Sequence, residues 1–241
     1  MTAAPSVVVR SSEAETARAL ACWLHERVTE IVAEGREARL ALSGGRTPWA
    51  MLRAFAALAP PWDKIAIFQV DERFVPIDDP RSNAGQIARI LPPAGRFRPI
   101  PVDVRQAPEA VAQDYEDLLL QAMAGEPVFD IVHLGLGEDG HTASLVPGDP
   151  ILEVGNRWVA ATTAAYQGAR RVSLTYPTLR RAGRIAWLVT GPEKKDILRR
   201  FLKEEAGLPA CRVPRDHAFL FTDDAAWGGG LPERSPASDS P

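Results

Sequence analysis

Residues 128–147 read VFDIVHLGLGEDGHTASLVP, and the character of the chain changes halfway along this stretch. The first seven residues are almost all apolar and include β-branched side chains, which is typical of a strand buried on both faces. Glycine, charged and hydroxyl residues follow at once, with His141 among them. A buried strand that ends in such a loop is typical of the carboxyl edge of an open α/β sheet, where ligands bind. His141 is therefore the first candidate for a catalytic residue.

Segments of strand and helix character alternate on both sides of this stretch. The other segments with strand character are Val7–Val9, Ala38–Leu42, Ile65–Val70, Phe97–Val102, Trp158–Thr162, Arg171–Thr175, Ile185–Thr190 and His217–Phe221. Helical spacing of apolar residues, with caps and stops, indicates helices at 12–35, 49–58, 84–91, 108–124, 177–181, 191–204 and 223–227. The alternation predicts an α/β fold: a Rossmann-like, doubly wound, mostly parallel sheet with helices on both faces.

The chain has 241 residues, 46% of them apolar and 24% charged, and is long enough to bury a substantial core. We expect a single domain over residues 1–227 and a disordered tail at 228–241, which is rich in Gly, Pro and Ser. The net charge of −3 argues against nucleic acid or an anionic membrane as a partner. No apolar run approaches the roughly 20 residues that span a bilayer, and no apolar signal segment opens the chain. We therefore expect a cytoplasmic protein.

The two cysteines, Cys22 and Cys211, lie far apart in the sequence and form no Cys/His cluster. Such usage is typical of a reducing compartment and predicts no structural metal. Cys22 falls among the apolar residues of the first expected helix, so we expect it to pack in the core.

The strand at 38–42 runs into Ser43-Gly44-Gly45-Arg46-Thr47-Pro48 and then into a helix. Two glycines let backbone N–H groups approach a ligand closely, and the helix N-terminus adds a positive dipole end. This loop is a candidate phosphate cradle, and the alternative is a plain strand-to-helix turn. It is not a P-loop, because the Gly-Lys-Ser/Thr ending is absent.

Two further strands end in charged residues. Asp71-Glu72-Arg73 follows the strand at 65–70, and Lys194 comes shortly after the strand at 185–190. Charges directly after a buried strand are costly unless they are paired or face a cleft, so a salt-bridged rim and a binding cleft both stay open. Because the carboxyl ends of parallel strands lie on one edge of a sheet, we expect these segments to converge with the loop at 135–141.

Residues 135–140 match the Gly-x-Gly-x-x-Gly pattern of dinucleotide-binding loops. That reading requires a long helix directly after the glycines, and Pro147 and Pro150 prevent it. The acidic side chains Glu138 and Asp139 would also repel a pyrophosphate. We therefore expect no NAD and no other cofactor. Asp139 and His141 alone are too few ligands for a metal site, whereas a neutral histidine can act as a base.

A set of motifs covering roughly Val7 to Asp224 resembles the 6-phosphogluconolactonases. In order they are Ser43-Gly44-Gly45-Arg46-Thr47-Pro48, Asp71-Glu72-Arg73, Ser82-Asn83, Gly135-Leu136-Gly137-Glu138-Asp139-Gly140-His141-Thr142-Ala143-Ser144-Leu145, Arg171-Val172-Ser173-Leu174-Thr175 and Thr190-Gly191-x-x-Lys194. The resemblance implies a Rossmann-like fold shared with glucosamine-6-phosphate deaminase. It also implies hydrolysis of 6-phospho-D-glucono-1,5-lactone in the oxidative pentose phosphate pathway, without metal or nucleotide.

This resemblance leads to a hypothesis for the site. The catalytic candidates are His141 as the base that activates water, Arg73 for the oxyanion, and either Asp71 or Asp139 to orient His141. The substrate- and phosphate-binding candidates are Ser43, Gly44, Gly45, Arg46, Thr47, Gly137, Arg171 and Lys194. The partner is then a small phosphosugar lactone, and we expect the chain to be a monomer, with a weak dimer as the alternative.

The sequence departs from related patterns at several positions. Deaminases have a catalytic glutamate where this chain has Val146, and commonly a tyrosine where it has Arg73. Both differences favour the lactonase over the deaminase, and a non-catalytic sugar-phosphate-binding protein is a third alternative. Lactonases often have Lys-Pro-Pro where this chain has residues 165–170, AYQGAR. The sequence therefore leaves open whether Arg170 or Arg171 contacts the substrate.

Overall fold

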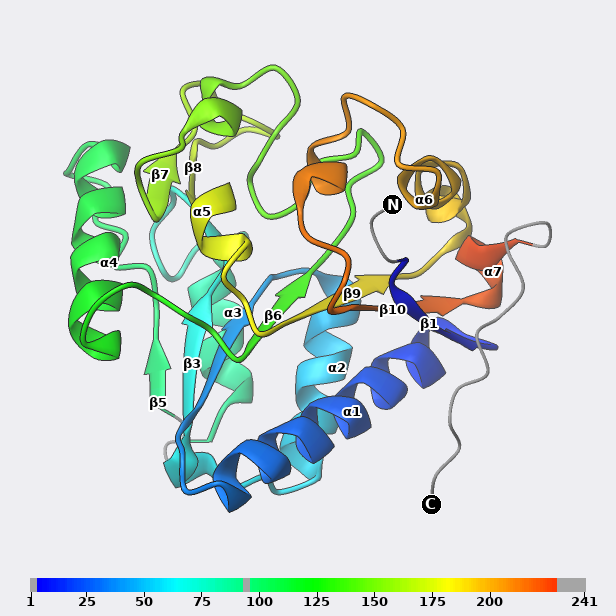
Figure 1. Ribbon diagram of the computed structural model, residues 1–241. Helices are drawn as coiled ribbons and strands as arrows, with labels where there is room; N and C mark the ends of the chain where they lie inside the picture. The colour runs from blue at the N-terminus through cyan, green and yellow to red at the C-terminus, as the bar shows by residue number, and fades with distance from the viewer. Residues whose placement is uncertain (1–3, 93–95, 229–241) are drawn as a thin grey trace.

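The computed structural model describes residues 4–92 and 96–228 (Figure 1). A seven-stranded sheet forms its centre, and every neighbouring pair of strands in it is parallel. The strands lie in the order β1 (Ser6–Arg10), β10 (Ala218–Asp223), β9 (Arg184–Val189), β6 (Ile131–Leu134), β2 (Ala38–Leu42), β3 (Ile65–Gln69) and β5 (Arg96–Arg98). The predicted doubly wound parallel sheet is confirmed. Of the tail expected at 228–241, residues 229–241 lie outside the described residues.

Helices cover both faces of this sheet and create two apolar cores. One core holds apolar residues of α1 (Glu13–Ala33), α2 (Arg46–Ala57) and α3 (Asn83–Ile90). The other holds those of α4 (Pro108–Met123), α5 (Tyr176–Leu179), α6 (Lys195–Leu202) and α7 (Asp224–Trp227). Short 3₁₀ turns lie at Trp62–Lys64, Pro150–Glu153, Pro192–Lys194 and Pro209–Arg212. Within the described ranges, no helix is both long and apolar enough to cross a membrane.

A second, antiparallel sheet lies beyond the carboxyl edge of the first. It has the order β4 (Asp71–Arg73), β8 (Arg171–Leu174), β7 (Val159–Ala161). The charged run at 71–73, expected only to follow the strand at 65–70, is thus a strand of its own. Glu72 in this strand is buried, and hydrogen bonds offset the cost of burying its charge. The carboxylate accepts them from the backbone N–H groups of Arg73, Asn83 and Ala84. Burial nevertheless raises the pKa of Glu72.

Three local expectations were wrong. Cys22 is exposed, because it lies one position beyond the buried stripe of α1 that includes Ala21, and one residue turns a helix by about 100°. The strand expected at 97–102 ends at Arg98, since Pro99 and Pro101 cannot donate to a ladder. Helix α2 starts three residues before Trp49, because Gly45, at φ 135°, serves as its N-cap.

Candidate active site

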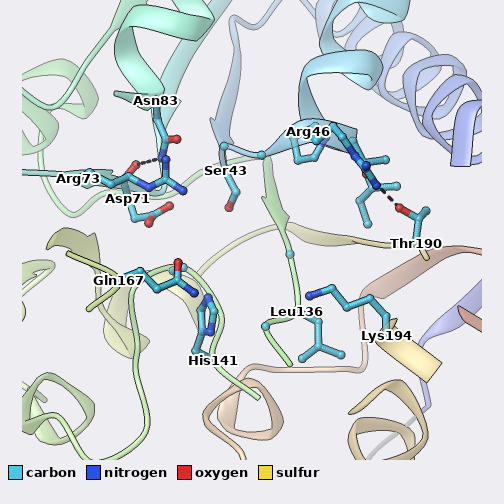
Figure 2. A pocket seen from close by; sticks show the side chains of 18 of the residues that line it. Ser43, Arg46, Asp71, Arg73, Asn83, Leu136, His141, Gln167, Thr190 and Lys194 are labelled. Atoms are coloured by element: carbon cyan, nitrogen blue, oxygen red, sulfur yellow. Dashed lines mark hydrogen bonds between the residues drawn. The ribbon is translucent and has the colours of Figure 1, made fainter. Parts of the chain in front are cut away.

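Four neighbouring strands, β9, β6, β2 and β3, end at the same pocket of about 350 Å³ (Figure 2). Its volume is within the range of small-molecule sites. The candidates from the sequence that line it are Ser43, Gly44, Gly45, Arg46, Thr47, Asp71, Arg73, Gly137, His141, Arg171 and Lys194. The remaining candidate, Asp139, lies behind His141 and does not line the pocket. Segments that are far apart in the sequence therefore meet at the edge where the parallel topology predicts them.

His141 and Asp139 form a hydrogen-bonded pair within the loop after β6. The Nδ1 atom of His141 lies 2.6 Å from Oδ1 of Asp139, and the same oxygen accepts the His141 backbone N–H at 3.1 Å. Since the carboxylate can only accept, the proton resides on Nδ1 and leaves Nε2 with a lone pair. Burial raises the pKa of Asp139, but the hydrogen bonds from His141 outweigh this and the pKa is lowered. The pair can therefore supply an oriented base.

Asp71, the other candidate partner of His141, is bound elsewhere. Its Oδ2 accepts a 2.6 Å hydrogen bond from the hydroxyl of Ser144, and its backbone oxygen accepts one from the Asn83 amide. No hydrogen bond joins Asp71 to His141 in the described part of the chain. Of the two carboxylates, Asp139 is therefore the one that is hydrogen-bonded to His141 among the described residues, and Asp71 is a buried carboxylate in the pocket wall.

The glycines of this loop permit the pair to form. A Cβ atom on Gly137 would lie 1.9 Å from Nδ1 of His141, so any side chain would collide with the imidazole. The Gly137 N–H also donates to the His141 carbonyl at 2.8 Å, which closes the loop. No long helix follows, because the next helical segment is the 3₁₀ turn at Pro150–Glu153. In this chain the Gly-x-Gly-x-x-Gly segment thus leaves room for the His141 imidazole and does not begin a dinucleotide-binding helix.

The glycine loop after β2 presents unpaired backbone donors. The Ser43 N–H is already bonded to Nδ1 of His133 at 3.3 Å, so Ser43 contributes no free amide to a cradle. Within the described residues, the N–H groups of residues 44–47 have no hydrogen-bond partner, and α2 has no side-chain cap. Such a helix N-terminus favours an anion. The candidate cradle is therefore narrowed to Gly44–Thr47.

Three cations point into the pocket without a carboxylate partner. Among the described residues, Arg73, Arg171 and Lys194 make no ion pair, and burial lowers the pKa of Arg171. Lys194 extends into the pocket in Figure 2. Arg46 differs, because its guanidinium is paired with Glu13 at 3.0 Å on the exposed rim. Unpaired cations around a pocket create an anion-binding field.

The side chains of Arg170 and Arg171 point in opposite directions from the backbone. Arg171 lines the pocket and is buried, whereas Arg170 is paired with Glu109. Successive side chains in a strand point to opposite faces, which explains the difference. Of the two arginines, only Arg171 is placed to contact a ligand.

Sequence reasoning assigned no role to three neighbours of the site. His133, buried in β6, has no free surface, and burial lowers its pKa to about 4. Asn83 lines the pocket, and Tyr166 contacts both Asp139 and His141. Asn83 was at least within a quoted motif, but nothing in the sequence distinguishes His133 from an ordinary strand residue. The described residues contain no group of three or more side chains suited to a metal ion.

Gly44 is predicted to be intolerant of a side chain. A Cβ there would lie 1.9 Å from Oδ1 of Asn83, which hydrogen bonds to Asp71 and Glu72 hold in place. We expect Gly44→Ala to lower the free energy of unfolding by about 1–3 kcal/mol, as overpacking does. Gly155→Ala is the matched control, because nothing lies within 4 Å of its Cβ position. Equal melting temperatures for the two variants would refute the clash.

The fold and the pocket define an α/β protein with a cation-lined pocket, suited to a small anionic ligand, at the carboxyl edge of a doubly wound sheet. The chain belongs to the family described as glucosamine-6-phosphate isomerases/6-phosphogluconolactonase, whose sequence model matches residues 11–222. The resemblance seen in the motifs is confirmed at the level of the family.

Individual relatives agree with this assignment. A 6-phosphogluconolactonase from Synechocystis is 40% identical over 199 residues, which cover 78% of this chain and 81% of the relative. The crystal structure of 6-phosphogluconolactonase from Leishmania guyanensis matches with a TM-score of 0.82 at 27% identity, over 94% of this chain and 99% of that one. A monomeric glucosamine-6-phosphate deaminase matches with a TM-score of 0.74 at 18% identity, over 92% and 98%, and so shares the fold.

Proposed function

We propose that this protein hydrolyses 6-phospho-D-glucono-1,5-lactone to 6-phosphogluconate, in the cytoplasm and as a step of the oxidative pentose phosphate pathway. The observation that carries the proposal is the His141–Asp139 pair, which faces a pocket lined by three unpaired cations. The relatives named 6-phosphogluconolactonase support the choice of substrate. A phosphosugar lactone combines the anionic group that the cations would hold with an ester that a base can hydrolyse.

The phosphate group would bind at the N-terminus of α2. The free N–H groups of residues 44–47 would donate to its oxygens, and Lys194 and Arg171 would supply positive charge. Thr47 and Thr190 support this end of the pocket, since their hydroxyls lie 3.0 Å apart and Thr47 also donates to Glu13. With the phosphate held there, the lactone ring would extend toward Gly137 and His141.

His141 would act first as a base and then as an acid. Its Nε2 removes a proton from water while the oxygen of that water attacks C1 of the lactone, and Asp139 stabilises the imidazolium that forms. Arg73 stabilises the negative oxygen of the tetrahedral intermediate. When the C1–O5 bond breaks, the imidazolium returns its proton to the departing ring oxygen. The product is the open-chain acid, and the enzyme regains its starting protonation state.

The deaminase alternative lacks a catalytic group in this chain. Val146 stands where the deaminases have their catalytic glutamate, and an apolar side chain cannot transfer a proton. A sugar-phosphate sensor is also disfavoured, because binding alone gives no reason for an oriented histidine in the pocket. The lactonase accounts for both the cations and the histidine.

The decisive test is the rate at which purified protein consumes 6-phosphogluconolactone. We expect loss of lactone well above its spontaneous hydrolysis and no ammonia from glucosamine 6-phosphate. Release of ammonia would instead establish the deaminase. Absence of both activities, with retained binding of 6-phosphogluconate, would establish a binding protein.

Replacing Lys194 by alanine is expected to raise KM about 10- to 100-fold with a smaller change in kcat. The reason is that a charge-assisted hydrogen bond to the phosphate contributes about 1.5–3 kcal/mol in both the bound and the transition state. Lys195→Ala is the matched control, because Lys195 has the same charge, follows directly in the chain and does not line the pocket. A KM for Lys194→Ala equal to that of the control would place the phosphate elsewhere.

A further inference from the structure

We infer that Tyr166 is a positioning residue that holds the Asp139–His141 pair in its reactive geometry. The inference rests on the proposed function and assigns a role in it to a loop where this chain departs from the lactonase pattern. Tyr166 does not line the pocket, so it would act through Asp139 without touching the substrate.

Tyr166 completes the hydrogen bonding of the Asp139 carboxylate. Its hydroxyl donates to Oδ2 of Asp139 at 3.0 Å, while Oδ1 of the same carboxylate is bound to His141 at 2.6 Å. The two oxygens of Asp139 thus have different partners, the Tyr166 hydroxyl on Oδ2 and the His141 imidazole on Oδ1. A carboxylate held at both oxygens cannot rotate, and the imidazole that it holds stays in one orientation.

Tyr166 also contacts His141 directly. Its hydroxyl oxygen lies 3.3 Å from Nδ1 of His141, and the two rings meet edge to face with centroids 5.1 Å apart. The amide of Gln167 donates to the same hydroxyl at 3.4 Å. The tyrosine therefore restricts the imidazole by packing as well as by its bond to Asp139.

A tight turn at the end of the β7–β8 hairpin places Tyr166. Tyr166 and Ala169 form an antiparallel bridge, and the two residues between them have positive φ angles, 50° at Gln167 and 81° at Gly168. Two residues with positive φ are typical of a type I′ turn, the connection that matches the twist of a hairpin. The local sequence Tyr-Gln-Gly-Ala thus forms a rigid support.

The same residue is joined to the proposed phosphate-binding arginine. The guanidinium of Arg171 donates to the Tyr166 carbonyl at 3.1 Å and lies 5.6 Å from the centre of its ring. One loop residue therefore contacts both the catalytic pair and a substrate-binding cation. Tyr166 would therefore help to fix the position of His141 relative to the bound lactone.

Tyr166 remains a donor at every relevant pH. Burial and the hydrogen bond to the Asp139 carboxylate raise the pKa of its hydroxyl to about 12. A neutral phenol next to a carboxylate can only donate to it, so the direction of the bond is settled.

The test compares Tyr166→Phe with the wild-type enzyme. Phenylalanine keeps the ring and the backbone contact to Arg171 but removes the hydroxyl. We expect kcat to fall about 10- to 100-fold, the range of one hydrogen bond to a charged group, with KM within about twofold. An unchanged kcat, or a rise in KM alone, would overturn the inference.

A double-mutant cycle separates positioning from an independent effect. If Tyr166 acts through Asp139, Tyr166→Phe should cost nothing further in an Asp139→Asn background. The same fold-loss in both backgrounds would refute the inference. Tyr176→Phe removes a hydroxyl that is bonded to the Pro209 carbonyl, outside the pocket, and should leave kcat unchanged.

An NMR measurement tests the contact without relying on activity. The Nδ1 proton of His141 should resonate at a different chemical shift in Tyr166→Phe, because its acceptor Asp139 has lost a competing donor. A wild-type protein that fails to hydrolyse the lactone would defeat the proposed function, yet this shift would still report on Tyr166. An identical Nδ1 resonance in the two proteins would contradict the positioning role.

Discussion

His141→Gln is expected to lower kcat for lactone hydrolysis by about 10²–10⁴-fold, the usual contribution of a positioned general base. Glutamine can still donate a side-chain N–H to Asp139, so the loop should keep its conformation. It has no basic nitrogen in place of Nε2, however, and cannot remove the proton from water. KM should change little, because the Gly44–Thr47 amides, Arg171 and Lys194 are all retained.

The measurement is steady-state hydrolysis with the spontaneous rate subtracted. His25→Gln is the control, because His25 lies on α1 and does not line the pocket. Wild-type kcat in His141→Gln would mean that another group activates the water. A large loss in both variants would mean that the effect is on folding and not on the chemistry.

Acidification is expected to destabilise the fold through His133. In the unfolded chain this histidine binds a proton below its ordinary pKa of 6.5, but burial lowers the pKa in the folded state to about 4. The unfolded state therefore binds more protons between these two values, and stability falls as the pH falls through this window. The full loss is about 3 kcal/mol, reached near pH 4 and constant below it.

The burial of His133 also explains why the proton is excluded. Its Nδ1 accepts the Ser43 N–H, and its Nε2 is buried without a partner among the described residues. Protonation of Nδ1 would set its N–H against the Ser43 N–H, so that two donors face each other at the start of the glycine loop. Loss of stability should therefore be accompanied by loss of affinity for the phosphosugar.

Urea unfolding of wild type and His133→Asn between pH 7 and pH 4 tests this prediction. The Asn Oδ1 can still accept from Ser43 but does not titrate, so the variant should have a flatter dependence on pH, even if its stability at pH 7 is lower. Carboxylates contribute equally to both proteins and cancel in the comparison. Parallel curves for the two proteins would show that His133 is not the group responsible.

The sequence determined the architecture and the composition of the site. Alternating apolar strands and amphipathic helices predict a parallel sheet, and parallel strands must bring their carboxyl ends to one edge. That alone placed Ser43–Thr47, Arg73, His141 and Lys194 together, as observed. Pro147 and Pro150 likewise argued against a dinucleotide from local rules, because a helix cannot continue through them.

Only the tertiary structure decided which neighbours each group has. The sequence alone does not distinguish Asp71 from Asp139 as the partner of His141. In the structure Asp71 accepts a hydrogen bond from Ser144, whereas the short loop places Asp139 against His141. The choice of Arg171 over Arg170 depends on which face of β8 is turned to the pocket.

The roles of His133 and Tyr166 likewise follow only from the tertiary structure. One is an ordinary position in a strand, and the other belongs to a hairpin turn that is remote in sequence from the loop it supports. Periodicity and turn rules act over a few residues, whereas hydrogen bonds between distant segments depend on how the whole chain packs. The sequence therefore specifies the residues at the sheet edge, and packing specifies their pairs.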